Sequence, residues 1–320
     1  MRVQVLGSSS GTPTTQRNVS AYAVFRDDLK PWYLVDCGEG TQHQILKSTL
    51  AIYHLEAIFI THKHGDHCYG LPGLIASAGL SGRTHPMYLI APDEVLSFVR
   101  AVLEMTELTL AFELKLLSVE QCAGQSFSWV DVTTCPLKHR VPSYAYKFVE
   151  TQIVRKLNIN KLTEHGIPSG PHFNLLQRGE NTSFNGQILL SDDYTFNAWR
   201  ARVIIVCGDN EAPKCLDDEI EGTDLLVHEA TFLAVDLKKV GFHTGHSDVE
   251  RVAEYAQKRE LPSLLLTHFS ARYGGELCMN RIKETAQARY SGALYIAADG
   301  MTIEVDKQGV SHLIEAQFSG

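Results

Sequence analysis

Four side chains of types that commonly bind metals fall within six residues of this sequence. They follow an apolar run at 57–60 that reads as a buried strand, and they are His62, His64, Asp66 and His67. Gly65 permits the sharp backbone turn that lets these side chains converge from one loop. Imidazole nitrogens and a carboxylate are the ligands of hydrolytic zinc sites, which keep a position open for water. The spacing therefore predicts a metal centre, because a chance cluster of polar loop residues explains a lone histidine better than four such ligands.

This cluster cannot complete the ligand shells of two metal ions, so further ligands must come from other parts of the chain. Loops at the ends of strands converge at one edge of a sheet. His139 lies just past a strand expected at 130–135, Asp209 follows the run RVIIVCG, and His268 ends the run SLLLTH. Each of the three could equally have a structural role by itself. Together with the first cluster they form a coherent set of ligands for two metals.

The elements that must position these residues read as a mixed α/β pattern, with sheets at the centre and helices outside. Apolar runs typical of strands lie at 3–6, 21–25, 32–36, 57–60, 87–91, 130–135, 144–149, 202–207, 224–228 and 263–268. Helical periodicity follows at 42–50, 70–80, 94–104, 247–259 and 277–290. Residues 150–183 fit neither pattern and are rich in turn formers at 167–171. We therefore expect one domain over 1–320 with an insertion at 150–183.

Composition limits the class of protein. The chain has 44% hydrophobic and 21% charged residues, which is ordinary globular usage. Its 29 basic and 37 acidic side chains give a formal charge of -8, which argues against a nucleic-acid partner. The seven cysteines are scattered and contain no CxxC pair, which favours a reducing cytoplasm. No apolar stretch is long enough for a secretory signal or a membrane span, so we expect neither export nor insertion.

Short motifs then occur in a fixed order along nearly the whole chain. They are LGSSSGTPTTQRNVS at the start, DCGEGTQHQI at 36–45, THKHGDHCYGLPGL at 61–74, KHRVPSYAYKF at 138–148, GIPSGP at 166–171, CGDN at 207–210, HEATF at 228–232, GHS at 245–247 and LLLTHFSARY at 264–273. THKHGDH resembles the HxHxDH signature of the metallo-β-lactamase superfamily. The ordered series more narrowly resembles the tRNase Z family, endoribonucleases that process the 3′ ends of tRNA.

The resemblance implies an αββα metallo-β-lactamase-like sandwich with a protruding inserted arm, and two zinc ions per subunit. In this family pattern one zinc would be bound by His62, His64 and His139. The other would be bound by Asp66, His67 and His268, with Asp209 bridging the two. The same residues were selected above from their spacing.

The implied reaction removes the 3′ trailer from precursor tRNA and leaves a 3′-hydroxyl tRNA body and a 5′-phosphate trailer. Two metal ions that share a carboxylate lower the pKa of a bridging water and hold the phosphate oxygens. Asp66 would orient that water and accept its proton. His246 resembles the general acid of the family, with Glu229 orienting its imidazole. Ser247 reads more simply as the N-cap of the following helix.

The resemblance also implies where substrate binds. The insertion at 150–183 would be an arm that grips tRNA, often across a homodimer. Its tip would contain Gly166, Pro168, Gly170 and Pro171, and further contacts would come from Arg17, Ser270 and Arg272. Residues 147–180 carry five basic and three acidic side chains, so this segment is weakly basic although the whole chain is acidic. On this basis a precursor tRNA partner is expected after all, in the cytoplasm.

Three positions depart from the family pattern. Thr15 stands where a lysine is usual, Lys63 stands between the first two ligands where an apolar residue is common, and Asn210 replaces a frequent threonine. None of them removes a ligand. Two alternatives remain open: a small-molecule phosphodiesterase on the same fold, and a metal-free RNA-binding relative. The second would lack ligands, and none is missing from this sequence.

Overall fold

The computed structural model describes residues 1–314, and its contacts divide the chain into two compact units. The first comprises Met1–Val149 and the residues from Arg202 onward, and the second comprises Glu150–Ala201. The second unit begins where the insertion was expected and continues to Ala201, beyond the expected end at 183. The two units are described separately below.

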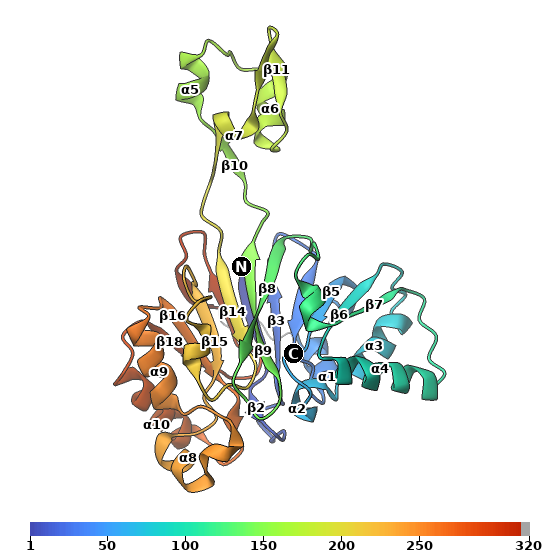
Figure 1. Cartoon of the computed structure of the whole chain (residues 1–320), viewed down its shortest axis with the longest axis vertical. Helices are drawn as coiled ribbons and strands as arrows, with labels where there is room; N and C mark the ends of the chain where they lie inside the picture. Colours follow the sequence, from blue (N-terminus) through green and yellow to red (C-terminus); the bar gives the residue numbers. More distant parts are fainter. Residues whose placement is uncertain (315–320) are drawn as a thin grey trace. The chain divides into compact units, whose positions relative to one another are not determined.

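Within the described residues, the first unit contains two large sheets (Figure 1). One has eight strands in the order β20-β19-β1-β3-β4-β5-β6-β7. Their bounds are β1 Arg2–Gly7, β3 Ala21–Phe25, β4 Trp32–Val35, β5 Leu55–Phe59, β6 Met87–Ile90, β7 Leu114–Leu117, β19 Thr302–Val305 and β20 Ser311–Ile314. The other has six strands in the order β18-β16-β15-β14-β9-β8. Their bounds are β8 Val130–Leu137, β9 Ser143–Glu150, β14 Val203–Cys207, β15 Leu225–Glu229, β16 Ser263–Thr267 and β18 Ala293–Ile296.

Aromatic side chains join the inner faces of the two sheets. The ring of Phe59 from β5 lies 5.1 Å from that of Tyr146 and 5.4 Å from that of Phe148, both in β9. Tyr33 of β4 lies 6.1 Å from Phe148. All four rings are fully buried. Aromatic pairs at these distances add to the burial of apolar area, so an aromatic core joins the two sheets.

Helices cover the outer faces (Figure 1). Helix α3 (Leu71–Leu80) and helix α4 (Asp93–Met105) pack against the first sheet through one apolar cluster, and α9 (Val249–Lys258) and α10 (Glu276–Gln287) pack on the second. This is the expected αββα arrangement. The remaining elements of the unit are α1 Thr41–Leu46, α2 Gly65–Cys68, α8 Ala234–Val240, the short strands β2 Ser9–Ser10 and β17 Phe269–Ser270, and the 3₁₀ turns η1 Ile52–His54, η2 Val119–Cys122, η3 Pro213–Leu216 and η4 Phe242–Thr244.

The start of α9 corrects one expectation. Ser247 does not cap this helix, because its hydroxyl donates to the carbonyl of Asn210 at 2.6 Å. Asp248 is the N-cap, and its carboxylate accepts from the backbone N–H of Arg251 at 2.9 Å. Asp and Ser serve this role about equally well, so the sequence alone does not separate the two neighbours.

The second unit has its own small core, formed by Leu162, Ile167, Leu176, Leu189 and Tyr194. Its elements are β10 Arg155–Leu157, α5 Ile159–Glu164, α6 Pro171–Gln177, β11 Thr182–Phe184, β12 Gln187–Leu189, α7 Ser191–Tyr194 and β13 Thr195–Asn197. The sequence pattern missed these elements because helices and strands of three to seven residues carry too few turns for periodicity to register.

Among residues 1–314, none of the helices combines the length and the apolar content that crossing a membrane requires.

Candidate functional site

The ends of five strands deliver polar side chains to one place in the first unit. Loops that follow β4, β5, β8, β14 and β16 carry Asp36, His62, His139, Asp209 and His268 in that order. Strands β4 and β5 are parallel to each other, as are β14, β15 and β16, so their carboxyl ends open toward the same edge of each sheet. Ligands of α/β proteins bind at such edges.

Four ligand atoms form a first group. The Nε2 atom of His62 lies 3.0 Å from Nδ1 of His64, and Nε2 of His139 lies 3.2 Å from the same Nδ1. The Oδ2 atom of Asp209 lies 3.5 Å from Nε2 of His62 and 3.6 Å from Nε2 of His139. The histidines expected to share one metal therefore come together.

A second group lies on the other side of Asp209. The Nε2 atoms of His67 and His268 are 3.2 Å apart, and Oδ2 of Asp66 lies 3.6 Å from the first and 3.3 Å from the second. The Oδ1 atom of Asp209 lies 3.4 Å from Nε2 of His67 and 3.3 Å from Nε2 of His268. Asp209 thus presents one oxygen to each group.

These spacings match the requirements of zinc. Ligands at the ~2.0–2.1 Å that zinc prefers stand roughly 3.3–3.4 Å apart at tetrahedral corners. The Oδ1 atom of Asp209 is buried and has no hydrogen-bond partner in the described part of the chain. A buried carboxylate oxygen without a donor is costly unless a cation satisfies it. The residues present therefore fit two metal ions with Asp209 between them.

Hydrogen bonds on the far side of four of the five histidine rings orient these ligands. Asp36 Oδ2 accepts from Nδ1 of His67 at 2.6 Å, and Asp36 also accepts from the backbone and hydroxyl of Thr61. The other three contacts are His62 Nδ1 to Thr61 Oγ1 (3.0 Å), His139 Nδ1 to the Gly245 carbonyl (2.7 Å) and His268 Nδ1 to Thr231 Oγ1 (3.0 Å). In the neutral form of these four rings Nδ1 carries the proton and donates it, so that Nε2 faces the centre with a free lone pair for a metal ion.

The two central carboxylates are ionised. Burial alone would favour their neutral forms, but the positive charge of neighbouring protonated imidazoles outweighs it when no metal ion is bound. His67 and His268 hold the pKa of Asp66 well below its usual range, and His268, His67 and His62 do the same for Asp209. Both groups are therefore anionic near neutral pH, which is the state in which a carboxylate binds a cation.

His246 and Glu229 form a pair beside the first group. The Nδ1 atom of His246 lies 3.1 Å from Oε1 of Glu229 and 3.7 Å from Oδ2 of Asp209. Burial opposes charge on this imidazole, but the carboxylates of Glu229 and Asp209 together raise its pKa to about 9. Bound cations would offset Asp209 and leave Glu229. The side chain of His246 is 12% exposed and that of Glu229 is 1% exposed, so the imidazole reaches solvent and the carboxylate does not.

Asn210 is a part of the site that the sequence did not explain. Its backbone N–H donates to Oε1 of Glu229 at 2.9 Å, and its side-chain Nδ2 lies 3.0 Å from Nε2 of His228. Its Oδ1 accepts from the N–H groups of Lys138 and Ala212. The amide thus connects the loop that carries His139 with the loop that carries Asp209. The signal available in the sequence was an Asn directly after a candidate ligand, at the end of an apolar strand run.

The unusual Lys63 has a structural explanation. Its Nζ donates to Oε1 of Glu94 in α4 at 2.7 Å. This pairing directs the ammonium group of Lys63 toward that helix.

The expected substrate-binding residues of the first unit differ in whether their side chains are free to contact a substrate. The guanidinium of Arg17 donates to Ser8 Oγ at 2.7 Å and to the Ala297 carbonyl at 2.6 Å, so it holds the N-terminal loop in place. Ser270 Oγ accepts from Nε of Arg272 at 3.1 Å. Arg272 is exposed, and its guanidinium carbon lies 4.9 Å from the centre of the Phe232 ring.

The remaining expected substrate-binding residues lie in the second unit. Gly166 follows α5 with φ +69, which favours glycine, and Pro171 is the first residue of α6, where proline is well tolerated. Pro168 is exposed, and its carbonyl accepts from His172 Nε2 at 2.8 Å. Gly170 precedes α6 in an extended conformation. These residues shape a loop, and none belongs to the metal-ligand groups.

The charge of the second unit corrects the expectation of a basic arm. Glu150–Ala201 contains five basic residues (Arg155, Lys156, Lys161, Arg178, Arg200) and five acidic ones (Glu150, Glu164, Glu180, Asp192, Asp193). Five minus five gives a formal charge of zero. The expected excess of positive charge was counted over residues 147–180. That segment includes Lys147 of the first unit and ends before Asp192 and Asp193.

Comparisons with known proteins agree with this geometry. Residues 1–155 match the family model described as anti-Pycsar protein Apyc1. A ribonuclease Z of Pseudomonas putida is 44% identical over 313 residues, which cover 97% of this chain and 98% of the relative. The structure of the short form of human tRNase Z is similar with a TM-score of 0.66 and 23% identity, covering 96% of this chain and 100% of that one. The metallo-beta-lactamase fold protein YhfI from Bacillus subtilis has a TM-score of 0.64 and 18% identity, covering 94% and 98%.

The two structural likenesses confirm the predicted metallo-β-lactamase fold. The match to this ribonuclease Z covers 97% of the chain at 44% identity, and therefore extends over both units. The chain therefore belongs to the ribonuclease Z family.

Proposed function

We propose that this protein is a metal-dependent endoribonuclease that removes 3′ trailers from precursor tRNA. The products are a tRNA body with a 3′-hydroxyl and a trailer with a 5′-phosphate. The observation that carries the proposal is the pair of ligand groups that share Asp209, with His246 beside them, in a chain of the ribonuclease Z family.

The site would hold two zinc ions. His62, His64 and His139 would hold one, Asp66, His67 and His268 the other, and Asp209 would touch both. Zinc at such a site supplies a water of lowered pKa and charge that stabilises the phosphate oxygens.

Asp66 positions the attacking water and accepts its proton. Its Oδ2 accepts from the Gly11 N–H at 2.7 Å and lies near the second group of imidazoles, so its orientation is fixed. The hydrogen bonds found for Asp66 within residues 1–314 all use Oδ2. Oδ1 is therefore available as the proton acceptor.

His246 protonates the leaving group. Its Nδ1–H donates to Glu229, which leaves Nε2–H to face the substrate. As the new bond from water oxygen to phosphorus forms, the bond from phosphorus to the 3′ oxygen breaks, and that oxygen takes the Nε2 proton. Glu229 stabilises the charged imidazolium and fixes the ring.

Substrate contacts outside the metal centre follow from exposure and charge. Arg272 offers a guanidinium to a phosphate, with Ser270 beside it. The second unit, Glu150–Ala201, would be the tRNA-binding arm, with Gly166, Pro168, Gly170 and Pro171 shaping its tip. Because this unit is neutral overall, its contact with tRNA depends on shape and on single cations such as Lys156 rather than on net charge.

The active form would be a homodimer in the cytoplasm. The seven cysteines are all free in the structure, which suits a reducing compartment.

The neutral second unit is also the observation that favours a second candidate, a phosphodiesterase that acts on small molecules. A deletion separates the two candidates. Strands β9 and β14 are antiparallel neighbours in which Val149 pairs with Val203, so a short glycine-containing turn can join residues 149 and 202. The shortened protein should lose cleavage of precursor tRNA and keep hydrolysis of bis(p-nitrophenyl) phosphate. Full retention of tRNA cleavage would contradict the role of the arm.

The central experiment incubates zinc-loaded protein with a 3′-extended precursor tRNA and maps both cleavage ends. We expect one cut near the discriminator base and the end groups given above. Asp66→Ala should abolish the cut. An absence of cleavage by the wild type, or equal cleavage by the variant, would refute the proposal.

A further inference from the structure

Asp66 receives a hydrogen bond from a loop near the start of the chain. The backbone N–H of Gly11 donates at 2.7 Å to Oδ2 of Asp66, the oxygen that also faces the imidazoles of His67 and His268. Within residues 1–314 no other backbone group is found to donate to Asp66. Hydrogen bonds to a carboxylate that binds a metal orient it and raise its affinity for the ion. The position of Gly11 therefore matters for the second group of ligands.

The loop of residues 8–18 carries Gly11 at an exposed point. Gly11 has φ +72, and in the described part of the chain no atom beyond its chain neighbours lies within 4 Å of the place where a Cβ would stand. Packing around Gly11 therefore does not hold it in place. The N–H groups of Ser8 and Ser9 both donate to the carbonyl of Asn18, at 2.9 Å and 2.8 Å, which closes the loop. The two ends of the loop must set the position of Gly11.

The first end of the loop belongs to a pair of strands. Strand β2 pairs in parallel with β17, and Ser9 lies opposite Phe269. Phe269 directly follows His268, and its N–H donates to the carbonyl of Ser8 at 2.9 Å. Backbone contacts therefore fix this end of the loop.

The second end of the loop depends on the side chain of Asp299. Its Oδ2 accepts from the N–H of Asn18 at 2.5 Å, and its Oδ1 accepts from the hydroxyl of Ser8 at 2.8 Å. One carboxylate thus contacts both ends of the loop. Asp299 lies between β18 of one large sheet and β19 of the other. The loop is therefore supported from the segment in which the chain crosses between the two sheets.

Arg17 completes this network. Its Nη1 donates to the hydroxyl of Ser8 at 2.7 Å and to the carbonyl of Ala297 at 2.6 Å. Burial raises the pKa of Asp299, whereas the hydrogen bonds from Asn18 and Ser8 and the charge of Arg17 act to lower it. A carboxylate that is largely removed from water is costly unless donors satisfy it. Asp299 and its donors therefore stabilise one arrangement of the loop.

We propose that Asp299 is a positioning residue for the second metal ion. It fixes the loop of residues 8–18 so that the N–H of Gly11 holds Asp66 in the orientation that binds the ion. The inference rests on the proposed function for the role of Asp66. Asp299 is not among the grouped metal ligands, so it acts only through Gly11 and Asp66.

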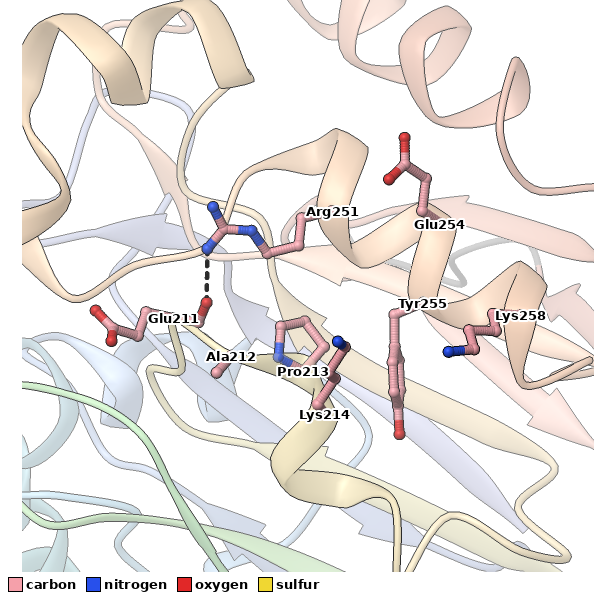
Figure 2. Close-up of a pocket in the computed structure, with 8 residues that line it drawn as sticks. All are labelled: Glu211, Ala212, Pro213, Lys214, Arg251, Glu254, Tyr255 and Lys258. Atoms are coloured by element: carbon pink, nitrogen blue, oxygen red, sulfur yellow. Dashed lines mark hydrogen bonds between the residues drawn. The ribbon is translucent and has the colours of Figure 1, made fainter.

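Zinc affinity tests this sequence of contacts without any substrate. Competition with a chelator measures how tightly the full-length protein holds each zinc ion. Asp299→Ala should weaken the binding of one zinc ion about ten- to a hundredfold and leave the other within about twofold. Glu254→Ala is the matched control and should change neither. Its carboxylate also lies near an arginine, Arg289 at 3.2 Å, but it borders a separate cavity of about 460 Å³ between η3 and α9 that no residue of the loop lines (Figure 2).

A double-mutant cycle with Asp66→Ala separates positioning from a general loss of structure. If Asp299 acts through Asp66, Asp299→Ala should change zinc affinity by less than about twofold in a protein that already lacks the Asp66 carboxylate. Equal losses with and without that carboxylate would overturn the proposal, and so would an unchanged zinc affinity in Asp299→Ala alone.

Two milder variants keep the test decisive. Asp299→Asn can still accept from Asn18 and donate to Ser8, so its zinc affinity should stay within about threefold of the wild type. If Asp299→Ala does not fold, Ser8→Ala takes its place in the cycle. It removes one of the two donors to Asp299 and should cost about three- to tenfold in zinc affinity, again only when Asp66 is present.

Cleavage of precursor tRNA, measured in parallel, separates this inference from the proposed function. Coupling between Asp299 and Asp66 in a protein that does not cut precursor tRNA would support the positioning role and refute the proposed function. Cleavage by a wild type whose Asp299→Ala variant keeps its zinc affinity would refute the positioning role alone.

Discussion

Replacing Glu229 by glutamine tests the assignment of the general acid most directly. The change keeps the size of the side chain and removes its charge. The Oε1 atom of Glu229 faces two donors, Nδ1 of His246 at 3.1 Å and the N–H of Asn210 at 2.9 Å, and Oε2 accepts from the backbone and hydroxyl of Thr231. A glutamine can turn its carbonyl oxygen either toward His246 and Asn210 or toward Thr231, but not toward both. The variant therefore loses a charge-assisted hydrogen bond to His246 or places an N–H group against a backbone donor.

The size of the effect follows from that bond. A hydrogen bond to a charged group contributes about 1.5–3 kcal/mol, which corresponds to roughly a ten- to 150-fold change in rate when the bond stabilises the imidazolium that protonates the leaving oxygen. Removing the imidazole itself with His246→Ala should cost more, within the ~10²–10⁴-fold typical of general acids. The assay is single-turnover cleavage of a 3′-extended precursor tRNA.

The leaving group distinguishes acid catalysis from a structural effect. A ribose 3′ oxygen needs a proton as it departs, whereas p-nitrophenolate leaves without one. Both variants should therefore keep most of their activity on bis(p-nitrophenyl) phosphate. Glu219→Gln, a carboxylate that contacts Lys147 away from the site, is the control and should leave both rates unchanged. Equal losses on the two substrates, with both metals still bound, would refute the role of His246 as the acid.

Three further predictions concern the metals and the fold. Asn210→Ala should lower zinc affinity about ten- to a hundredfold, because the loops that carry His139 and Asp209 lose their connection. A competition titration with a chelator measures the affinity, and an unchanged value would contradict the role of Asn210. Removal of metal by dialysis against a chelator should lower the melting temperature by about 5 °C. Zinc at a hundred times its Kd should restore about 3 kcal/mol of unfolding free energy. Calorimetry would disprove this if the apo and zinc forms had the same melting temperature. Arg83→Met should destabilise the fold by about 3 kcal/mol, because the buried guanidinium donates to the carbonyls of Tyr53, His85 and Pro86, whereas the exposed Arg100→Met should be neutral in urea unfolding.

The sequence predicted which side chains come together because of a property of α/β sheets. His62, Asp209 and His268 each follow a run of buried strand residues, and the carboxyl ends of such strands meet at one edge. Once the strands are identified in the sequence, these side chains can be assigned to one site without coordinates. The division into two groups, by contrast, came from the family resemblance, and the structure gives its basis in the two oxygens of Asp209.

Other features could not be predicted because they depend on contacts between distant segments. The roles of Asn210 and Lys63 rest on partners 18 or more residues away. The extent of the second unit depends on Leu189 and Tyr194 completing a core with Leu162, and no local pattern marks that boundary. The net charge of -8 pointed away from RNA, and that inference was wrong for a member of the ribonuclease Z family. A nuclease holds the reacting phosphate with bound metal ions and single side chains, so its overall charge is a poor guide.

A close approach between the two sheets explains why the two ligand groups are fixed relative to each other. A Cβ atom on Gly208 would lie 2.5 Å from Cβ of Thr61, so only glycine fits at this position. The hydroxyl of Thr61 lies 2.9 Å from Oδ2 of Asp36 and 3.0 Å from Nδ1 of His62. The end of β14, which carries Asp209, therefore rests against the residue that orients His62 and, through Asp36, the second group. Because backbone and hydroxyl contacts set these positions, the spacing of the ligands is a consequence of how the two sheets pack.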